Sequence, residues 1–351
     1  MTPIPPDLRG RRGRDRFWVT VDAVLKGVQR VRMMREPVVP SVRPVDRSLR
    51  LIVLEVRREV EDVVSLRLGA PDGGVLPRWQ PGCHLDVLLP SGRRRQYSLC
   101  GDPADRRAYR IAVRRLPGGG GGSVEIHEAL VEGMTITAAG PRNAFPFLAR
   151  DRYLFLAGGI GITPILPMVQ AAHLLGADWR LVYTGRTSGS LPFLDELAGL
   201  PAERIAVRAD DERGMPDGAG LLRGARPGTA VYCCGPAPMI DAVRAAFVPD
   251  GTSSLHFERF APPPVTGGRP FEVELRRSGL TLRVPADRTA LDVIRDALPD
   301  VAYSCRQGFC GTCRTGLLAG TADQRAQADP DGDAMLICVS RATGGRLTLD
   351  L

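Results

Sequence analysis

Four cysteines near the carboxyl end have a spacing that suits a metal cluster. Cys305, Cys310 and Cys313 stand in CRQGFCGTC, and Cys338 follows in MLICVSRA. C-x4-C-x2-C with a distant fourth cysteine is the plant-type spacing, in which four thiolates hold two irons. Zinc is the alternative, but zinc sites commonly use paired C-x2-C units. The spacing therefore predicts a [2Fe-2S] cluster, which handles single electrons.

The other four cysteines are predicted to be ordinary side chains, with one exception. Cys83 and Cys100 stand beside turn residues and are expected to be small buried side chains. Cys233 and Cys234 end an apolar strand, and neighbouring strand residues point to opposite faces. Only Cys234, which precedes Gly235, is therefore expected to face a ligand at the end of the strand.

A glycine turn follows the apolar strand that begins at Tyr153. In AGGIGITP, residues 157–164, Thr163 is a plausible N-cap and Pro164 a plausible first helical residue, which would aim backbone N–H groups at a ligand. A packing turn without a ligand is the alternative. The spacing is not G-x-G-x-x-G, and no acidic residue ends the next strand. These departures disfavour a standard Rossmann dehydrogenase.

A polar strand offers groups that could hold a phosphorylated aromatic ring. In RRRQYSLCGDP, Arg95 could grip a phosphate, Tyr97 could pack against a flat ring, and Ser98 could bond a ring edge. Downstream, LPGGGGGSVEIHEAL places Ser123 at a predicted helix start, which is a second anion site. Each feature alone is more often an ordinary strand or loop, but together and in this order they point to a flavin.

The surrounding pattern predicts three folded domains. Short alternating strands over 48–148 indicate an antiparallel β-barrel. Apolar strands alternating with helices over 149–258 indicate an α/β domain with a parallel sheet. The Pro- and Gly-rich segment 259–270 reads as a linker. Strands, a helix near LDVIRDAL and the cysteine loop make 271–351 a small α+β domain.

Charge and hydropathy exclude several classes of protein. The chain of 351 residues carries a formal charge of +8, but residues 1–50 hold 12 basic and 5 acidic residues, so the remainder is nearly neutral. With no basic stripe in a recognisable motif, nucleic-acid binding is not expected. No run of 18 uncharged apolar residues and no secretory signal occur, which predicts no transmembrane segment and a cytoplasmic protein.

An amino-terminal arm, residues 1–47, carries most of the excess positive charge. Within it, residues 15–34 place apolar side chains at spacings of three and four, which predicts an amphipathic helix after the basic run RGRRGRDR. The apolar stripe could pack on the protein's own barrel. Alternatively, the arm could dock peripherally on an oxygenase or on an anionic membrane surface.

The combination of motifs resembles the phthalate dioxygenase reductase family, which includes vanillate O-demethylase reductases. The matching segments are RQYSL, GGS, GGIGITP, YCCGP, HFERF, and CRQGFCGTC with Cys338, and they span about residues 48–351. The resemblance implies a flavin barrel, a nicotinamide domain and a C-terminal plant-type ferredoxin domain of β-grasp fold. The domain order implies FMN, with NADH as the electron donor.

Residue roles follow from the resemblance by position. The FMN positions are Arg95, Tyr97, Ser98, Gly122, Ser123 and Phe260; the NAD positions are Gly159, Gly161, Thr163, Cys234, Gly235 and Pro236; the cluster ligands are Cys305, Cys310, Cys313 and Cys338. Cys234 is expected near the reacting nicotinamide, and no residue is predicted as an acid or base. NADH preference is open, because Arg186 and Ser188 could instead hold a 2′-phosphate.

The resemblance also implies a function. NADH delivers two electrons together, a cluster accepts one at a time, and a flavin between them resolves the mismatch. We therefore expect a reductase that passes electrons to a terminal oxygenase, most plausibly of Rieske type. A cytochrome P450 is the alternative acceptor. A redox-sensing or cluster-binding module without turnover is the alternative from another class.

Overall fold

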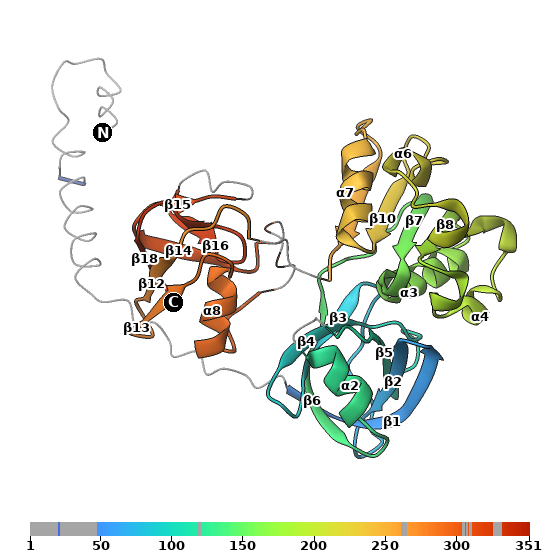
Figure 1. The fold of residues 1–351 in the computed structure, drawn as a ribbon, viewed down its shortest axis with the longest axis horizontal. Coiled ribbons are helices and arrows are strands. Elements are labelled where there is room, and N and C mark those ends of the chain that lie inside the picture. The colour runs from blue at the N-terminus through green and yellow to red at the C-terminus, as the bar shows by residue number, and fades with distance from the viewer. Residues whose placement is uncertain are drawn as a thin grey trace. The chain divides into compact units, whose positions relative to one another are not determined.

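The computed structural model describes residues 20–21, 48–117, 121–260, 265–303, 306, 308, 311–325 and 332–351 (Figure 1). The chain forms two compact units, Met1–Asp46 and Arg47–Leu351. In the first unit only Thr20 and Val21 are described, and both are helical. The rest of the predicted amphipathic helix lies outside the described residues.

The second unit begins with a six-stranded antiparallel sheet of order β4-β3-β6-β1-β2-β5. Its strands are β1 Ser48–Val60, β2 Val63–Gly69, β3 Cys83–Leu88, β4 Arg94–Ser98, β5 Ala108–Arg114 and β6 Thr135–Asn143. A bridge between Leu99 and Ile111 joins the two edge strands. Leu51, Leu85 and Ile111 are buried in its core, and helix α2 (Gly122–Ala129) follows β5. The predicted antiparallel barrel is confirmed.

A five-stranded parallel sheet of order β11-β10-β7-β8-β9 follows. Its strands are β7 Arg152–Gly158, β8 Asp178–Gly185, β9 Ile205–Ala209, β10 Ala230–Cys234 and β11 Ser254–Glu258. The helices are α3 Ile162–Leu174, α4 Leu194–Leu197, α5 Asp210–Arg213, α6 Gly218–Leu221 and α7 Ala237–Ala246, with short 3-10 turns η1 Gly159–Gly161, η2 Ser188–Ser190 and η3 Ala202–Arg204. The apolar central strands are buried on both faces, as the α/β prediction requires.

The carboxyl-terminal sheet has the order β13-β12-β18-β14-β16, and helix α8 contacts β13. The elements of this domain are β12 Phe271–Leu275, β13 Leu280–Val284, α8 Ala290–Ala297, β14 Arg314–Ala319, β15 Ala322–Asp323, β16 Ala334–Leu336, β17 Arg341–Ala342 and β18 Arg346–Leu349. Strands β15 and β17 form a separate two-stranded sheet. Thr289 caps α8 by accepting a hydrogen bond from Asp292 N at 3.1 Å. The predicted α+β domain is confirmed.

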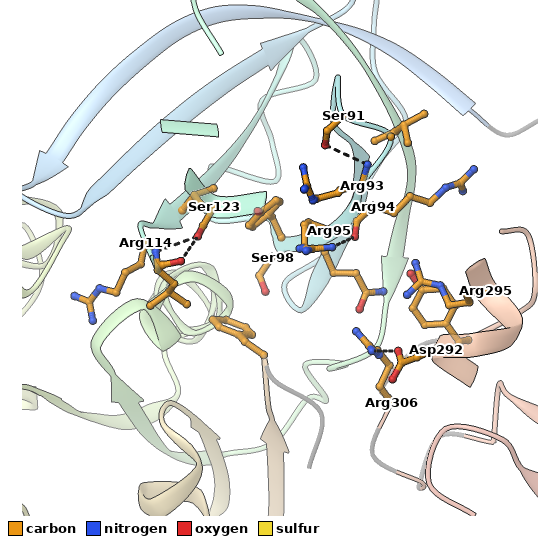
Figure 2. Close-up of a pocket in the computed structure, with 18 of the residues that line it drawn as sticks. Ser91, Arg93, Arg94, Arg95, Ser98, Arg114, Ser123, Asp292, Arg295 and Arg306 are labelled. Atoms are coloured by element: carbon orange, nitrogen blue, oxygen red, sulfur yellow. Dashed lines mark hydrogen bonds and ion pairs between the residues drawn. The ribbon is translucent and has the colours of Figure 1, made fainter. Parts of the chain in front are cut away.

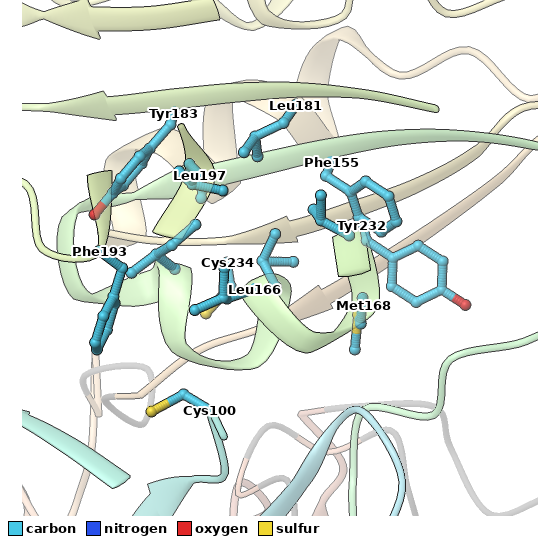
Figure 3. Packing of buried hydrophobic residues seen from close by; sticks show 14 of the residues in the cluster. Cys100, Phe155, Leu166, Met168, Leu181, Tyr183, Phe193, Leu197, Tyr232 and Cys234 are labelled. Carbon is cyan, nitrogen blue, oxygen red and sulfur yellow. The ribbon is translucent and has the colours of Figure 1, made fainter. Parts of the chain in front are cut away.

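The barrel and the parallel sheet share one buried cluster of side chains. Cys100 of the barrel packs in the same cluster as Leu166 of α3 and Cys234 of β10 (Figure 3). Arg110 of β5 adds a two-pronged ion pair to Glu196, with nitrogen–oxygen distances of 2.6 and 2.9 Å. This shared core holds the end of the barrel against the carboxyl edge of the parallel sheet, where a ligand would bind.

Two predictions concern the cysteines of the first two domains. Cys83 and Cys100 are both buried, as expected. Cys233 and Cys234 are buried in separate apolar clusters, which lie on opposite faces of the parallel sheet.

Within the described residues, no helix is long and apolar enough to cross a membrane.

Candidate functional site

A cavity of about 1010 Å³ lies where the barrel, the parallel sheet and the carboxyl-terminal domain meet. It is lined by six of the predicted site residues: Arg95, Tyr97, Ser98, Ser123, Thr163 and Phe260. The other predicted positions in the first two domains, Gly122, Gly159, Gly161, Cys234, Gly235 and Pro236, lie outside that lining. Five residues that were chosen for flavin binding are thus brought to one site (Figure 2).

One end of the cavity is suited to an anion. The side chain of Arg95 lies against the first residue of α2, because a Cβ added to Gly122 would come within 2.7 Å of Arg95 Nε. Ser123 follows in the first helical turn, where its hydroxyl accepts a hydrogen bond from Leu116 N at 3.0 Å. The same hydroxyl donates to Leu116 O at 3.3 Å, so the donors that converge here are the Arg95 guanidinium and the positive end of the helix, which suit a phosphate.

The middle of the cavity is suited to a flat ring. Tyr97 of β4 lines it, and burial raises the pKa of the phenol to about 12, so the side chain stays neutral. Phe260, which follows β11 closely, lines the cavity with half of its side chain exposed. An aromatic ring on each of two elements is the arrangement in which a planar heterocycle can be held by stacking.

A buried carboxyl group stands beside Ser98. The Ser98 hydroxyl donates to Glu258 Oε2 at 3.3 Å, from β4 to the carboxyl end of β11. Burial raises the pKa of Glu258 to about 7, although the bond from Ser98 acts to lower it. No acid or base is predicted from the sequence, and Glu258 is a carboxyl group that only the structure places beside a predicted flavin residue. Its position inside the motif HFERF was visible, but its partner is 160 residues away.

The glycine turn packs closely on neighbouring chain. A Cβ on Gly161 would lie 2.2 Å from the carbonyl oxygen of Cys234, and one on Gly159 would lie 2.8 Å from a guanidinium nitrogen of Arg114. Gly159 also has a φ of 52°. Glycine is therefore required here by packing, and the turn brings the helix α3 start to the cavity.

The helix boundary at this turn differs from the prediction. Thr163 was expected to cap the helix, but α3 begins at Ile162 with Gly161 as its N-cap. The 3-10 turn η1 already curls the chain, so the helix starts before Thr163. The Thr163 hydroxyl instead donates to Ile160 O at 3.0 Å, while the residue lines the cavity from the first turn.

The Cys234-Gly235-Pro236 segment lies directly behind the glycine turn. A Cβ on Gly158 would come within 2.6 Å of Pro236 Cδ. Cys234 is buried, and burial, ahead of the nearby Glu258, raises the pKa of its thiol well above the ordinary value. The group is therefore a neutral thiol and not a thiolate nucleophile.

Two of the four predicted cluster ligands can be placed. Cys313 and Cys338 are buried in the core of the carboxyl-terminal domain, and Ile337 N donates to Cys313 O at 3.4 Å, which brings their chain segments together. Gly308 and Gly311 have φ values of 83° and 73°, which allow a tight loop. Cys305 and Cys310 lie outside the described residues. Two buried cysteines in one core, with glycines that allow a tight loop, fit the donor chemistry of an iron–sulfur cluster.

The carboxyl-terminal domain also lines the cavity. Asp292 and Arg295 of α8 and Arg306 of the cysteine loop line it beside the labelled barrel residues (Figure 2), and Tyr303 also lines it. Arg306 forms an ion pair with Asp292, which ties the loop to the helix. Tyr303 and Arg306, which flank the predicted ligand Cys305 in the sequence, thus lie at the wall of the cavity that contains the predicted flavin-binding residues.

Glu212, which no sequence motif singles out, lies at the carboxyl edge of the parallel sheet. The Ser188 hydroxyl, in η2 after β8, donates to Glu212 Oε1 at 3.1 Å, in α5 after β9. Asp211 N donates to Arg186 O at 3.0 Å, so the two loops are joined. No acidic residue ends β8, but Glu212, in the helix that follows β9, places a carboxylate at the same edge of the sheet. A carboxylate there is suited to accept a hydrogen bond from a ribose hydroxyl.

Comparisons with known proteins agree with this arrangement. Residues 273–343 match the family model described as a 2Fe-2S iron-sulfur cluster binding domain. The phthalate dioxygenase reductase of Burkholderia cepacia is 38% identical over 87% of this chain and 98% of its own. A crystal structure titled phthalate dioxygenase reductase, described as modular for electron transfer from pyridine nucleotides to [2Fe-2S], matches at 37% identity with a TM-score of 0.69, covering 87% of this chain and 98% of that chain.

A larger protein also contains the same fold. An intact type IV self-sufficient cytochrome P450 monooxygenase matches at 35% identity with a TM-score of 0.70. The match covers 93% of this chain but only 44% of that one, so this chain spans less than half of the P450 structure.

The fold and the comparisons define an oxidoreductase with a flavin barrel, a nicotinamide domain and a [2Fe-2S] domain, which serves as the reductase component of an oxygenase system. The chain belongs to the phthalate dioxygenase reductase family. Its carboxyl-terminal domain matches the model of a 2Fe-2S iron-sulfur cluster binding domain, and the solved relative is described as transferring electrons from pyridine nucleotides to [2Fe-2S].

Proposed function

We propose that the cavity is the FMN site and that electrons leave it through the cysteine loop at its wall. Arg95, Ser123 and the start of α2 would hold the flavin phosphate. Tyr97 and Phe260 would hold the ring, and Ser98 would bond its edge. The observation that carries the proposal is the single cavity, which joins these residues to Tyr303 and Arg306 beside the cluster ligands.

The remaining residues would orient NADH and the cluster. The glycine turn and the start of α3 would receive the dinucleotide, and Cys234-Gly235-Pro236 would support the nicotinamide. Cys305, Cys310, Cys313 and Cys338 would hold the cluster. Glu258 would hold a proton at the carboxyl group that Ser98 bonds. A bound flavin takes up the two electrons of a hydride together and gives them up singly, which matches NADH to a one-electron cluster.

A spectrophotometric comparison tests this route. With NADH, the protein should reduce ferricyanide through the flavin, and cytochrome c through the cluster. Removal of FMN should abolish both activities, whereas removal of the cluster should abolish mainly the second. If NADH bleaches the flavin but the intact protein never reduces its cluster, the proposed route is wrong.

We propose a Rieske-type terminal oxygenase as the acceptor, since a relative that matches over 87% of this chain is a phthalate dioxygenase reductase. A cytochrome P450 is a second candidate, favoured by the match of 93% of this chain to part of a self-sufficient P450. Reduced protein should be mixed with each acceptor under anaerobic conditions. Bleaching of a Rieske spectrum supports the first, and a P450 carbon monoxide complex supports the second.

The amino-terminal arm and the compartment complete the proposal. A cytoplasmic location suits a protein that draws on NADH and holds thiolate ligands.

The arm would add electrostatic attraction to the acceptor. Deletion of residues 1–45 should leave ferricyanide reduction intact and weaken delivery to the native acceptor, with the defect shrinking as salt rises. Loss of flavin on deletion would favour packing of the arm on the barrel.

A further inference from the structure

A buried hydrogen bond joins the carboxyl-terminal domain to the barrel next to the cavity. The hydroxyl of Tyr303 donates to Asp86 Oδ1 at 3.3 Å, across 217 residues of sequence. Tyr303 is 5% and Asp86 is 6% exposed. Tyr303 precedes the predicted ligand Cys305 by two residues, and Asp86 pairs across the sheet with Gln96, next to Arg95 and Tyr97. The contact therefore links a residue beside two predicted flavin positions to a residue that precedes a predicted cluster ligand.

Both partners are held in place by further groups. Asp86 Oδ2 forms an ion pair with Arg142 at 3.1 Å, so its two oxygens serve two different partners. The guanidinium of Arg295 in α8 lies over the Tyr303 ring, with 3.9 Å between its carbon and the ring centroid. Asp86 is thus fixed on the barrel and Tyr303 on the carboxyl-terminal domain, and the hydrogen bond between them sets how the domains meet.

Another polar contact between the same surfaces, also formed by described residues, is weaker. Arg94 and Asp300 approach to 3.8 Å, but the Asp300 side chain is 96% exposed, and solvent screens such a pair. A hydrogen bond from a neutral hydroxyl to a buried carboxylate is worth more, because the carboxylate otherwise lacks one of its two partners. Tyr303 and Asp86 should therefore dominate the polar part of this contact.

We propose that Tyr303 and Asp86 are positioning residues that seat the cluster loop against the flavin cavity. This inference rests on the proposed function. One electron leaves the flavin and enters the cluster, and no bond forms or breaks in that step. Its rate depends steeply on the separation of the two groups, so a domain that lifts from the barrel transfers electrons more slowly. The effect should be confined to transfer between the two groups, since the proposed NADH site lies at the parallel sheet.

The test is Tyr303→Phe in the full-length, cofactor-loaded protein. The ring and its contact with Arg295 remain, so the change removes only the hydroxyl. In rapid mixing with NADH, the rate of cluster reduction relative to flavin reduction should fall, because loss of one charged hydrogen bond lowers the equilibrium constant for the seated arrangement about tenfold. Hydrogen exchange should rise in β3 and in residues 298–303. Tyr109→Phe is the matched control, because the Tyr109 hydroxyl donates to Pro77 O at 2.6 Å within the barrel.

A double-mutant cycle guards against a general loss of structure. Tyr303→Phe should have no further effect in an Asp86→Ala background, since both changes remove the same bond. If Tyr303→Phe leaves the ratio of rates and the exchange pattern as in the wild type, or if the two changes are additive, the positioning role is wrong. If the wild-type protein fails to reduce its cluster with NADH, the proposed function fails first, and the two failures are distinct.

Discussion

Ser98 and Glu258 form a hydrogen bond of 3.3 Å between the flavin strand of the barrel and the last strand of the parallel sheet. Because burial raises the pKa of Glu258 to about 7, this carboxyl group changes its charge near neutral pH. Because Glu258 forms a hydrogen bond with a predicted flavin-binding residue, the rate of flavin reduction should change with pH as Glu258 ionises.

Glu258→Gln should remove a pH dependence from the rate of flavin reduction by NADH. The wild-type rate should show an inflection near pH 7, and the variant should lack it and react about tenfold more slowly. Ser98→Ala should move the inflection to higher pH, because the Ser98 hydroxyl stabilises the ionised form. Glu203→Gln, at an exposed position in η3, is the control. A wild-type profile in Glu258→Gln would contradict the assignment.

The same titration has a consequence for stability. The pKa of Glu258 is raised above its ordinary value of 4.5, so between these values the native state holds a proton that the unfolded chain has lost. The free energy of unfolding should therefore fall as pH rises from about 4.5 to about 7, and level off above. Glu258→Gln should remove this component of the fall, as melting temperatures over that range would show.

Gly122→Ala should weaken FMN binding. The added Cβ would lie 2.7 Å from Arg95 Nε and would displace the guanidinium from the start of α2. If Arg95 holds the phosphate, the dissociation constant of FMN should rise about tenfold, which is the loss of roughly 1.4 kcal/mol. Fluorescence titration of the apoprotein measures it. Gly344→Ala is a matched control, since its Cβ would point into open space. Equal affinity in both variants would place the phosphate elsewhere.

Local patterns in the sequence predicted the elements well, because they depend on neighbouring residues. The alternating segment from Ser48 to Val60 forms β1 as expected, and the apolar run after Arg152 forms the buried strand β7. The cap at Thr163 was wrong, because the preceding η1 turn moved the start of α3.

Contacts between distant segments could not be predicted in the same way. The bonds of Ser98 with Glu258 and of Asp86 with Tyr303 arise only when separate domains pack together. Neither carboxylate stands in a pattern that sets it apart from an ordinary strand residue. In contrast, the four predicted cluster ligands have a spacing that chemistry itself restricts, and that spacing was readable without a structure.

Cys338→Ser should remove the cluster while leaving hydride transfer to the flavin. Cys338 is buried in the same core as Cys313, and a serine oxygen is a weaker ligand for iron than a thiolate. Iron and acid-labile sulfide should be lost, and cytochrome c reduction should fall at least tenfold, while NADH still bleaches the flavin. Cys83→Ser, another buried cysteine but in the barrel, should keep the cluster. A normal cluster spectrum in Cys338→Ser would contradict the ligand assignment.

Glu212→Gln should relax the preference for NADH. Glu212 accepts the Ser188 hydroxyl at 3.1 Å, beside the loop that carries Arg186, where an adenosine ribose would lie after β8. A carboxylate there can accept the 2′-hydroxyl of NADH and repels the 2′-phosphate of NADPH. Its removal leaves Arg186 and Ser188 to receive the phosphate. The kcat/KM for NADPH relative to NADH should rise about tenfold, which corresponds to roughly 1.4 kcal/mol.

The control for this change is Glu203→Gln, an equal loss of charge at an exposed position in the same domain. Glu203→Gln should leave the ratio of kcat/KM for NADPH to that for NADH unchanged. Salt in the solvent screens a distant charge, so its effect on both nucleotides is equally weak. The gain of Glu212→Gln toward NADPH should also diminish at high salt, since it arises from charge repulsion. If both variants keep the wild-type ratio, Glu212 does not face the ribose, and the two loops joined by Arg186 and Asp211 are structural only.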